Sequence, residues 1–132
     1  MKANAQRVGN DGFKHTVSVR KHELTVDEKE DDGGTDTGPS PQEMLAVSLA
    51  SCTAITIEMY AKRKGWNIGD VSVDVNYEPA QSGSPTRFEM AVKLPKELPE
   101  EQRERLMQIA AKCPVHRTLE GEVMFDETVE LS

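Results

Sequence analysis

The two cysteines, Cys52 and Cys113, are the residues of this 132-residue chain with the clearest potential for chemistry. A thiolate attacks electrophiles, coordinates metals and is oxidised to a sulfenic acid or a disulfide. The two residues lie 61 positions apart (113 − 52), far from a Cys-x-x-Cys spacing, so only the fold can bring them together. Each could equally be an inert core residue, because free cysteine is among the most buried residue types.

A long helix is predicted to carry Cys52. Ser40, Pro41 and Glu43 satisfy three rules for a helix start, as N-cap, first helical residue and acidic partner of a capping box. The helix is expected over residues 40–64 and is apolar almost all round, which predicts burial on several sides, by a partner subunit as well as by this chain. A position in mid-helix offers no dipole that lowers a thiol pKa, so a reactive Cys52 would need a nearby cation.

Cys113 lies at the end of a second predicted helix. Residues 99–113 begin with a proline and two glutamates, which suit the first turn of a helix. Leu106, Ile109 and Cys113 then recur on one helical face. Pro114 disfavours helical geometry at the residue before it, so the thiol is expected where this helix stops.

Three further stretches alternate apolar and polar residues as strands do. They predict N-terminal strands within residues 1–26, a hairpin over 68–94 and a final strand over 121–131. Inside the first stretch, Asp11-Gly12 favours a tight type I′ turn. The alternation changes parity near Arg20, which predicts a bulge or a strand break at that residue.

These elements predict a single α+β domain over residues 1–132 with a mostly antiparallel sheet. Between the first strands and the long helix, residues 27–39 are acidic and rich in glycine and have no apolar period, so we expect a mobile surface loop there. The stretch also lacks the D-x-D-x-D-G order of a calcium-binding loop.

The charge balance argues against two classes of partner. Sixteen lysines and arginines against 23 aspartates and glutamates give a net charge of −7, which disfavours binding to nucleic acid or to an anionic membrane surface. No stretch supplies the roughly 18 uncharged apolar residues of a membrane span, and the longest, from Met44 to Ile57, suits a buried core helix. The first residues lack the apolar region of a signal peptide, so we expect a cytoplasmic protein.

Three short runs of the sequence resemble one known family. They are Gly-Pro-Ser-Pro-Gln-Glu-Met-Leu at 38–45, Ala-Ser-Cys-Thr at 50–53 and Cys-Pro-Val-His at 113–116. This kind of helix start, a cysteine within that helix and a second cysteine before a proline coincide in the OsmC/Ohr family of thiol-dependent hydroperoxide reductases. The order of the predicted elements is similar to that family over essentially the whole chain.

The resemblance implies a redox-active pair of cysteines. Cys52 would be the peroxidatic thiolate, which attacks the peroxide O–O bond and becomes a sulfenic acid, and Cys113 would be the resolving thiol that condenses with it to a disulfide. A dithiol reductant of the lipoyl type would regenerate the pair, and no metal or organic cofactor is implied. Organic hydroperoxides are the expected substrates, because Met44, Leu45 and Met59 predict apolar surroundings.

The resemblance also implies an OsmC-like fold with a long buried central helix, in an intertwined homodimer with its active sites at the subunit interface. Well-studied members have a glutamate directly after the proline of the helix start, where this chain has Gln42 and places Glu43 one residue later. Nine helical residues (52 − 43) separate Glu43 from Cys52 by about 13.5 Å along the axis, so the capping box is its other expected role. Members also have an arginine from the N-terminal strands that lowers the thiolate pKa. Arg20 is our candidate for it, and the other cations of that region are Arg7, Lys14, Lys21 and Lys29.

Two alternatives stay open. His116 follows Cys113 by three residues and could ligate a metal with it, but no pair of residues has zinc-site spacing, which favours an ordinary surface histidine. The protein could also be a non-enzymatic module of the same fold that binds an apolar small molecule at the dimer interface, with both thiols as core residues. A pKa of Cys52 at or above about 8.5 would favour that module.

Overall fold

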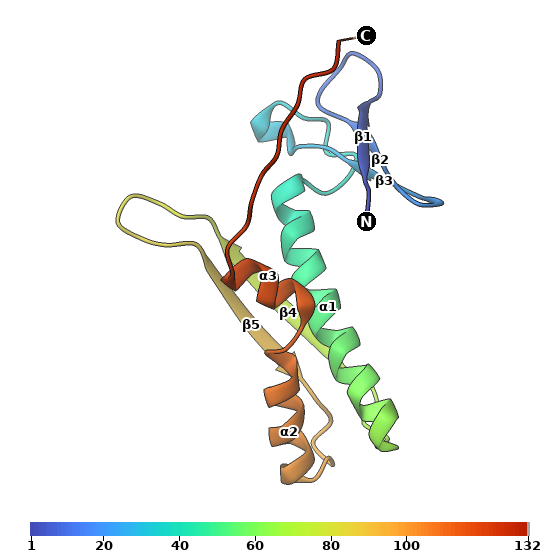
Figure 1. The fold of residues 1–132 in the computed structure, drawn as a ribbon, viewed down its shortest axis with the longest axis vertical. Coiled ribbons are helices and arrows are strands. Elements are labelled where there is room, and N and C mark those ends of the chain that lie inside the picture. The colour runs from blue at the N-terminus through green and yellow to red at the C-terminus, as the bar shows by residue number, and fades with distance from the viewer. Residues whose placement is uncertain (132) are drawn as a thin grey trace. The chain divides into compact units, whose positions relative to one another are not determined.

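The computed structural model describes residues 1–131, which form two compact units. The N-terminal unit is Met1–Val47, and the C-terminal unit begins at Ser48. Every strand pair in the described residues is antiparallel, and helices accompany the strands, so the predicted α+β class is confirmed (Figure 1). The two sheets are separate, one of three strands and one of two.

The sheet of the N-terminal unit has the order β1 (Asn4–Arg7), β2 (His15–Val19) and β3 (His22–Val26). Val19 pairs with His22, so Arg20 and Lys21 form a two-residue hairpin turn, in which Arg20 has a positive φ of 52°. The predicted strand break at Arg20 is therefore confirmed as a turn. The connection between β1 and β2 is longer than the tight turn expected at Asp11-Gly12. The Val8 amide donates to the Lys14 carbonyl at the base of the loop, and the Arg7 guanidinium donates to the carbonyls of Asn10 and Gly12 within it.

The acidic loop after β3, which was expected to lie on the surface, is mostly exposed but is built around a buried carboxylate. Asp27 is 1% exposed and accepts six hydrogen bonds of 2.6 to 3.3 Å. The donors are the amides of Phe13, Glu28, Thr35 and Thr37 and the hydroxyls of Thr35 and Thr37. The loop includes the 3-10 helix η1 (Glu30–Asp32), and it passes so close to itself that a Cβ on Gly34 would overlap the Glu28 carbonyl.

Helix α1 (Pro41–Lys64) begins at the predicted capping box and runs to the predicted basic end. The Glu43 amide donates to Ser40 Oγ at 3.1 Å, and the Ser40 amide donates to Glu43 Oε1 at 2.9 Å. By length and composition alone, α1 is long and apolar enough to cross a membrane. The core helix of a soluble protein can have the same length and composition. One face of the helix is buried, while Val47, Ile55 and Met59 expose half or more of their surface on another.

The C-terminal unit contains the hydrophobic core of the molecule. Its hairpin, β4 (Ser72–Glu78) and β5 (Arg87–Lys93), pairs Val73 with Val92 and stacks Tyr77 on Phe88 with ring centroids 4.7 Å apart. Helix α2 (Glu100–Ala110) packs against α1 through a shared apolar cluster. The buried members of that cluster are Ile57, Tyr60, Ala61, Ile68, Leu98, Leu106, Ile109 and Ala110.

An aromatic contact links the two helices at the end of α1. The phenol of Tyr60 accepts a hydrogen bond of 2.9 Å from Arg105 Nε on α2, and this bond lowers the Tyr60 pKa. The Tyr60 ring meets the Trp66 ring edge-on, with centroids 5.7 Å apart. The guanidinium groups of Arg63 and Arg105 and the ammonium of Lys64 lie 5.5 to 5.6 Å from the centre of the same ring.

The second predicted helix ends earlier than residue 113, and a helix that the sequence did not reveal follows it. The amides of Lys112 and Cys113 bond the carbonyls of Ile109 and Ala110 in a tightened last turn, after which the chain is extended at Cys113. Pro114 then starts α3 (Pro114–Glu120), because its fixed φ and missing N–H suit the first position of a helix.

The final strand predicted over 121–131 does not form in this chain. Residues 121–131 contain neither helix nor strand, and Val123, Phe125, Val129 and Leu131 are all more than half exposed. A strand exists only through hydrogen bonds to a neighbour, and no strand within residues 1–131 pairs with this segment.

Candidate active site

The thiols of Cys52 and Cys113 are brought together in the C-terminal unit, close enough for each to influence the pKa of the other. Cys52 comes from the middle of α1, and Cys113 comes from the extended residue between α2 and α3. Both are free cysteines in this structure. The fold thus joins two residues that are 61 positions apart (113 − 52) in the sequence.

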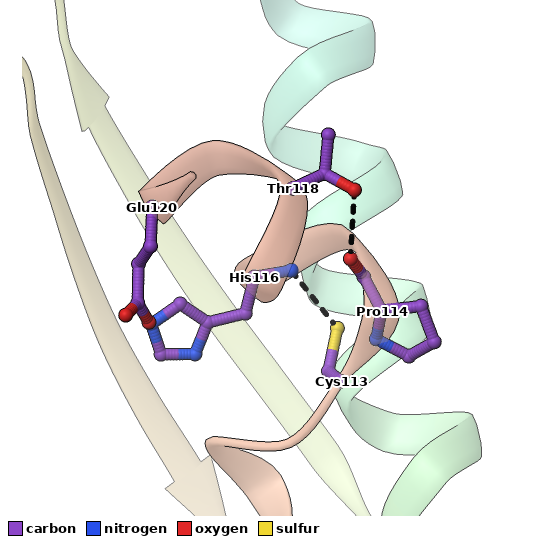
Figure 2. Close-up of polar contacts among 5 residues, drawn as sticks. All are labelled: Cys113, Pro114, His116, Thr118 and Glu120. Atoms are coloured by element: carbon purple, nitrogen blue, oxygen red, sulfur yellow. Dashed lines mark hydrogen bonds and ion pairs between the residues drawn. The ribbon is translucent and has the colours of Figure 1, made fainter. Parts of the chain in front are cut away.

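Cys113 is completely buried and is the N-cap residue of α3. Its sulfur accepts a hydrogen bond of 3.5 Å from the backbone amide of His116, as Figure 2 shows. The amide of Val115 and the hydroxyl of Thr53 also interact with this sulfur. Thr53 is itself fully buried on α1, and its hydroxyl has no hydrogen-bond partner in the described part of the chain.

Cys52 is half-buried and is the more accessible thiol of the pair. Besides Cys113, its sulfur interacts with the hydroxyl of Thr56, one turn further along α1, and with the Val115 amide. That amide therefore interacts with both sulfurs. An electrophile that enters the site meets Cys52 first, because Cys113 has no exposed surface.

The two thiols have opposite pKa shifts. Burial raises the pKa of Cys52, and the neighbouring Cys113 raises it further, which outweighs the Val115 amide and the Thr56 hydroxyl. Burial alone would also raise the pKa of Cys113, but hydrogen bonds from the Cys52 thiol, the His116 amide and the Thr53 hydroxyl outweigh it and lower that pKa.

The imidazole of His116 does not bond the Cys113 sulfur. Its Nε2 lies 2.6 Å from Oε1 of Glu120, one turn along α3, and Figure 2 shows the ring turned toward Glu120 on the side away from the sulfur. The contribution of His116 to the thiol is its backbone amide. Among residues 1–131 no three histidine, cysteine or acidic side chains come together as metal ligands would.

The other two predicted site residues, Glu43 and Arg20, belong to the N-terminal unit. The Glu43 carboxylate is engaged in the capping box, and hydrogen bonds from the Ser40 amide and hydroxyl lower its pKa. Arg20 is exposed in the turn between β2 and β3. Within the C-terminal unit the fold thus brings together Cys52 and Cys113, whereas Glu43 and Arg20 are described as part of the N-terminal unit.

Sequence reasoning missed the two groups that contact Cys113 most directly, the Thr53 hydroxyl and the amides at the start of α3. Thr53 follows Cys52 in the sequence, but its importance depends on a residue 60 positions away (113 − 53). The backbone amides cannot be identified from the side-chain types in the sequence. A proline directly after Cys113 was the available clue, because proline favours the first position of a helix and the residue before it is then the N-cap.

The N-terminal unit contains a separate cavity of about 700 Å³. Its walls are mostly apolar, with one histidine and two acidic residues among them. The lining residues are Ala5, Phe13, His15, Val17, Val26, Asp27, Glu28, Pro41 and Met44.

Three known proteins illustrate what this chain resembles. An uncharacterized protein from Haloferax volcanii is 27% identical over 124 residues, which are 92% of this chain and 90% of that protein. The crystal structure of an OsmC-like protein from Mycoplasma pneumoniae has a TM-score of 0.73 at 22% identity and covers 92% of this chain and 89% of its own. The organic hydroperoxide resistance protein OhrB of Bacillus subtilis has a TM-score of 0.60 at 19% identity and covers 92% of each chain.

At these identities the two crystal structures show that the fold is shared. The sequence itself matches the family model of the OsmC-like proteins over residues 33–128, a stretch that includes the capping box, both cysteines and all three α-helices. The architecture, the paired thiols and this match agree, and the chain belongs to the OsmC-like protein family.

Proposed function

We propose that this protein is a thiol-dependent peroxidase that reduces organic hydroperoxides, with Cys52 as the peroxidatic and Cys113 as the resolving cysteine. The observation that carries the proposal is the pair of neighbouring free thiols, in which one member is accessible and the other is buried. Structural relatives that are named organic hydroperoxide resistance proteins support the substrate class.

The chemistry needs only the two sulfurs, the peroxide and a reductant. The Cys52 thiolate attacks the terminal peroxide oxygen, the O–O bond breaks, and the sulfur becomes a sulfenic acid while the peroxide is reduced to an alcohol. Cys113 then attacks that sulfur, forms a disulfide and releases the oxygen as water. A dithiol of the lipoyl type reduces the disulfide and returns both thiols.

The proposal includes a cytoplasmic homodimer. Two exposed apolar surfaces support association with a second copy. One is the stripe on α1 formed by Val47, Ile55 and Met59, and the other is the unpaired segment 121–131. We also propose that Arg20 and Glu43 take part in the assembled site, Arg20 as a cation for the Cys52 thiolate and Glu43 as its carboxylate partner. Neither lysine nor arginine is among the main influences on the pKa of either thiol, so a cation would have to come from another part of the assembly. Arg20 supports this role because it is exposed.

The test is consumption of cumene hydroperoxide by the reduced protein with dihydrolipoamide as reductant. We expect Cys52→Ser to abolish turnover, because the attacking sulfur is lost, and Cys113→Ser to allow one turnover followed by over-oxidation of Cys52. Arg20→Ala and Glu43→Gln in the same assay test the two N-terminal residues. Equal rates for wild type and Cys52→Ser would refute the peroxidase.

The apolar cavity of the N-terminal unit favours a second candidate, a non-enzymatic module that binds an apolar small molecule. In that case the thiols are core residues and the double variant Cys52→Ser/Cys113→Ser binds as the wild type does. Titration with a fluorescent apolar dye distinguishes the two functions. A peroxidase loses all turnover in the double variant, whereas a binding module keeps its full affinity.

A further inference from the structure

We propose that a pocket between α2 and the end of α1 binds a 5′-mononucleotide, a ligand that combines a planar base, hydroxyl groups and one phosphate (Figure 1). The pocket has a volume of about 550 Å³ and belongs to the C-terminal unit. Its lining residues are Tyr60, Lys64, Trp66, Glu101, Gln102, Glu104, Arg105 and Gln108. Neither cysteine lines it, so the inference is independent of the proposed peroxidase.

The first argument is a group of cations that no carboxylate neutralises. The charged groups of Arg63, Lys64 and Arg105 each lie 5.5 to 5.6 Å from the centre of the Tyr60 ring. Within residues 1–131 none of these three side chains forms an ion pair. The dipole of α1 accounts for the cations of its last turn, but Arg105 comes from the middle of α2. The cluster therefore offers positive charge to an anion.

Hydrogen bonds hold the guanidinium of Arg105 at this pocket. Its Nε donates to the Tyr60 phenol at 2.9 Å, and its Nη1 donates to Oε1 of Gln108 at 2.9 Å. Three of its five N–H donors (5 − 2) remain for a ligand. Lys64 lines the same pocket and adds an ammonium group. Guanidinium and ammonium groups are the donors by which proteins hold phosphate.

The second argument is the half-buried indole ring of Trp66. The Tyr60 ring meets it at an interplanar angle of 69°, so the two rings are not stacked on each other. Trp66 also borders two further hollows of the surface, which shows that more than one side of the ring is open. Planar nucleic-acid bases stack on exposed aromatic rings of this kind, whatever the sequence of their polar edges.

The third argument is the pair of acidic residues in the lining. Glu101 and Glu104 are exposed and form no ion pair within residues 1–131, so their carboxylates are free to accept hydrogen bonds from hydroxyl groups. An acidic residue has the same task on the ribose in dinucleotide-binding folds. The two carboxylates also repel additional negative charge, which favours one phosphate over a chain of two or three.

A mononucleotide is the ligand class that uses all of these groups together. Inorganic phosphate would use the cations but not Trp66, and a nucleoside would use Trp66 and the carboxylates but not the cations. The amides of Gln102 and Gln108 offer donors and acceptors to the edge of a base. The volume of about 550 Å³ is in the range of roughly 300 to 1,000 Å³ that is typical of small-molecule sites.

The experiment is isothermal titration calorimetry of the full chain with the 5′-monophosphates of adenosine, guanosine, cytidine and uridine. The matching nucleosides, ribose 5-phosphate and inorganic phosphate are titrated under the same conditions. We expect at least one nucleotide to bind about tenfold more tightly than its own nucleoside and than either phosphate without a base, because only the nucleotide engages both the ring and the cations.

Single substitutions locate the binding. Lys64→Ala and Arg105→Ala should each weaken nucleotide binding about tenfold, because each removes a charged donor to the phosphate. Lys62→Ala and Arg103→Ala are the matched controls, since they remove exposed cations of the same two helices that do not line the pocket. Lys64 is exposed, so Lys64→Ala keeps the test decisive if the loss of the bond to Tyr60 unfolds Arg105→Ala.

Trp66→Leu tests the role of the ring separately. Leucine keeps an apolar side chain but offers no flat surface, so nucleotide affinity should fall about tenfold while the affinity for ribose 5-phosphate stays unchanged. A variant that loses both affinities together would show that Trp66 only supports the fold, and circular dichroism checks that each variant is folded.

Four results would overturn the inference. They are the absence of binding below a Kd of about 1 mM for all four nucleotides, equal affinity for inorganic phosphate, equal losses in the control variants, and loss of both affinities in Trp66→Leu. The double variant Cys52→Ser/Cys113→Ser should bind nucleotide as the wild type does. Failure of the peroxidase therefore leaves this inference standing, and failure of nucleotide binding leaves the peroxidase standing.

Discussion

The Asp27 carboxylate and the Cys113 sulfur are both buried polar centres, but their surroundings differ. Asp27 is 1% exposed and accepts six hydrogen bonds of at most 3.3 Å, so its carboxylate is fully hydrogen-bonded. Cys113 is fully buried with one backbone donor at 3.5 Å, a neighbouring thiol and the buried Thr53 hydroxyl, which has no hydrogen-bond partner in the described residues. The hydrogen bonds of the Asp27 centre hold its loop in place, whereas the Cys113 centre has fewer hydrogen bonds and includes a hydroxyl without a partner in the described residues.

The substitution Asp27→Asn is expected to have the largest effect on stability and tests the structural role of the Asp27 centre. The amide has the same size, but it loses the charge and presents donors to donors, so we expect the melting temperature at pH 7 to fall by about 10 °C. Asp31→Asn, an exposed acid in the same loop, is the matched control and should melt with the wild type. Circular dichroism melts give both values, and an unchanged Asp27→Asn would contradict the structural role.

The loss of stability caused by Asp27→Asn should depend on pH. The hydroxyls of Thr35 and Thr37 and the surrounding amides hold the pKa of Asp27 well below its usual range. A carboxyl whose pKa is lower in the folded state stabilises above its unfolded pKa of about 4, and this stabilisation is lost as pH falls toward the folded value. The gap in melting temperature between wild type and Asp27→Asn should therefore narrow below about pH 4.

A smaller test is Ser40→Ala, which removes half of the capping box. The Glu43 amide loses its acceptor, and we expect the free energy of unfolding to fall by about 1 kcal/mol. Glu43→Gln keeps an oxygen that the Ser40 amide can bond, so its effect should be smaller. Urea titrations measure both, and a larger loss for Glu43→Gln would mean that the Glu43 charge has a role beyond the cap.

The smallest change in stability is expected at the thiol centre itself. Thr53→Val replaces a buried hydroxyl, which has no hydrogen-bond partner in the described residues, by a methyl group, so the free energy of unfolding should change by less than about 1 kcal/mol. The pKa of Cys113 should nonetheless rise, because the hydroxyl lowers it. Ultraviolet absorbance of the thiolate across a pH titration measures this shift, and an unmoved Cys113 would show that Thr53 is only a packing residue.

The sequence predicted what local chemistry determines. The helix start at Ser40, Pro41 and Glu43 was found because the capping box lies within four consecutive positions. The hairpin of β4 and β5 and the break at Arg20 followed from alternation, which is also a property of neighbours. Both thiols were identified by residue type and by resemblance, not by any pattern that shows their contact.

What the sequence could not predict depends on residues far apart or on a neighbouring strand. The buried centre of the acidic loop was not predicted, because nothing local shows that Asp27 collects donors from Phe13, Thr35 and Thr37. The alternation of 121–131 shows that this segment can form a strand, but a partner edge decides whether it does. The surroundings of Cys113 include Thr53, 60 positions away (113 − 53).

The packing of Trp66 against Tyr60 has a consequence for how the protein can be observed as it unfolds. Trp66 is the only tryptophan in the chain and belongs to the C-terminal unit, so the N-terminal unit has no indole emission of its own. Indole emission then follows the environment of the α1–α2 contact, while circular dichroism follows the backbone of the whole chain. The two unfolding curves coincide only if both units unfold as one cooperative system, and a gap between them measures their independence.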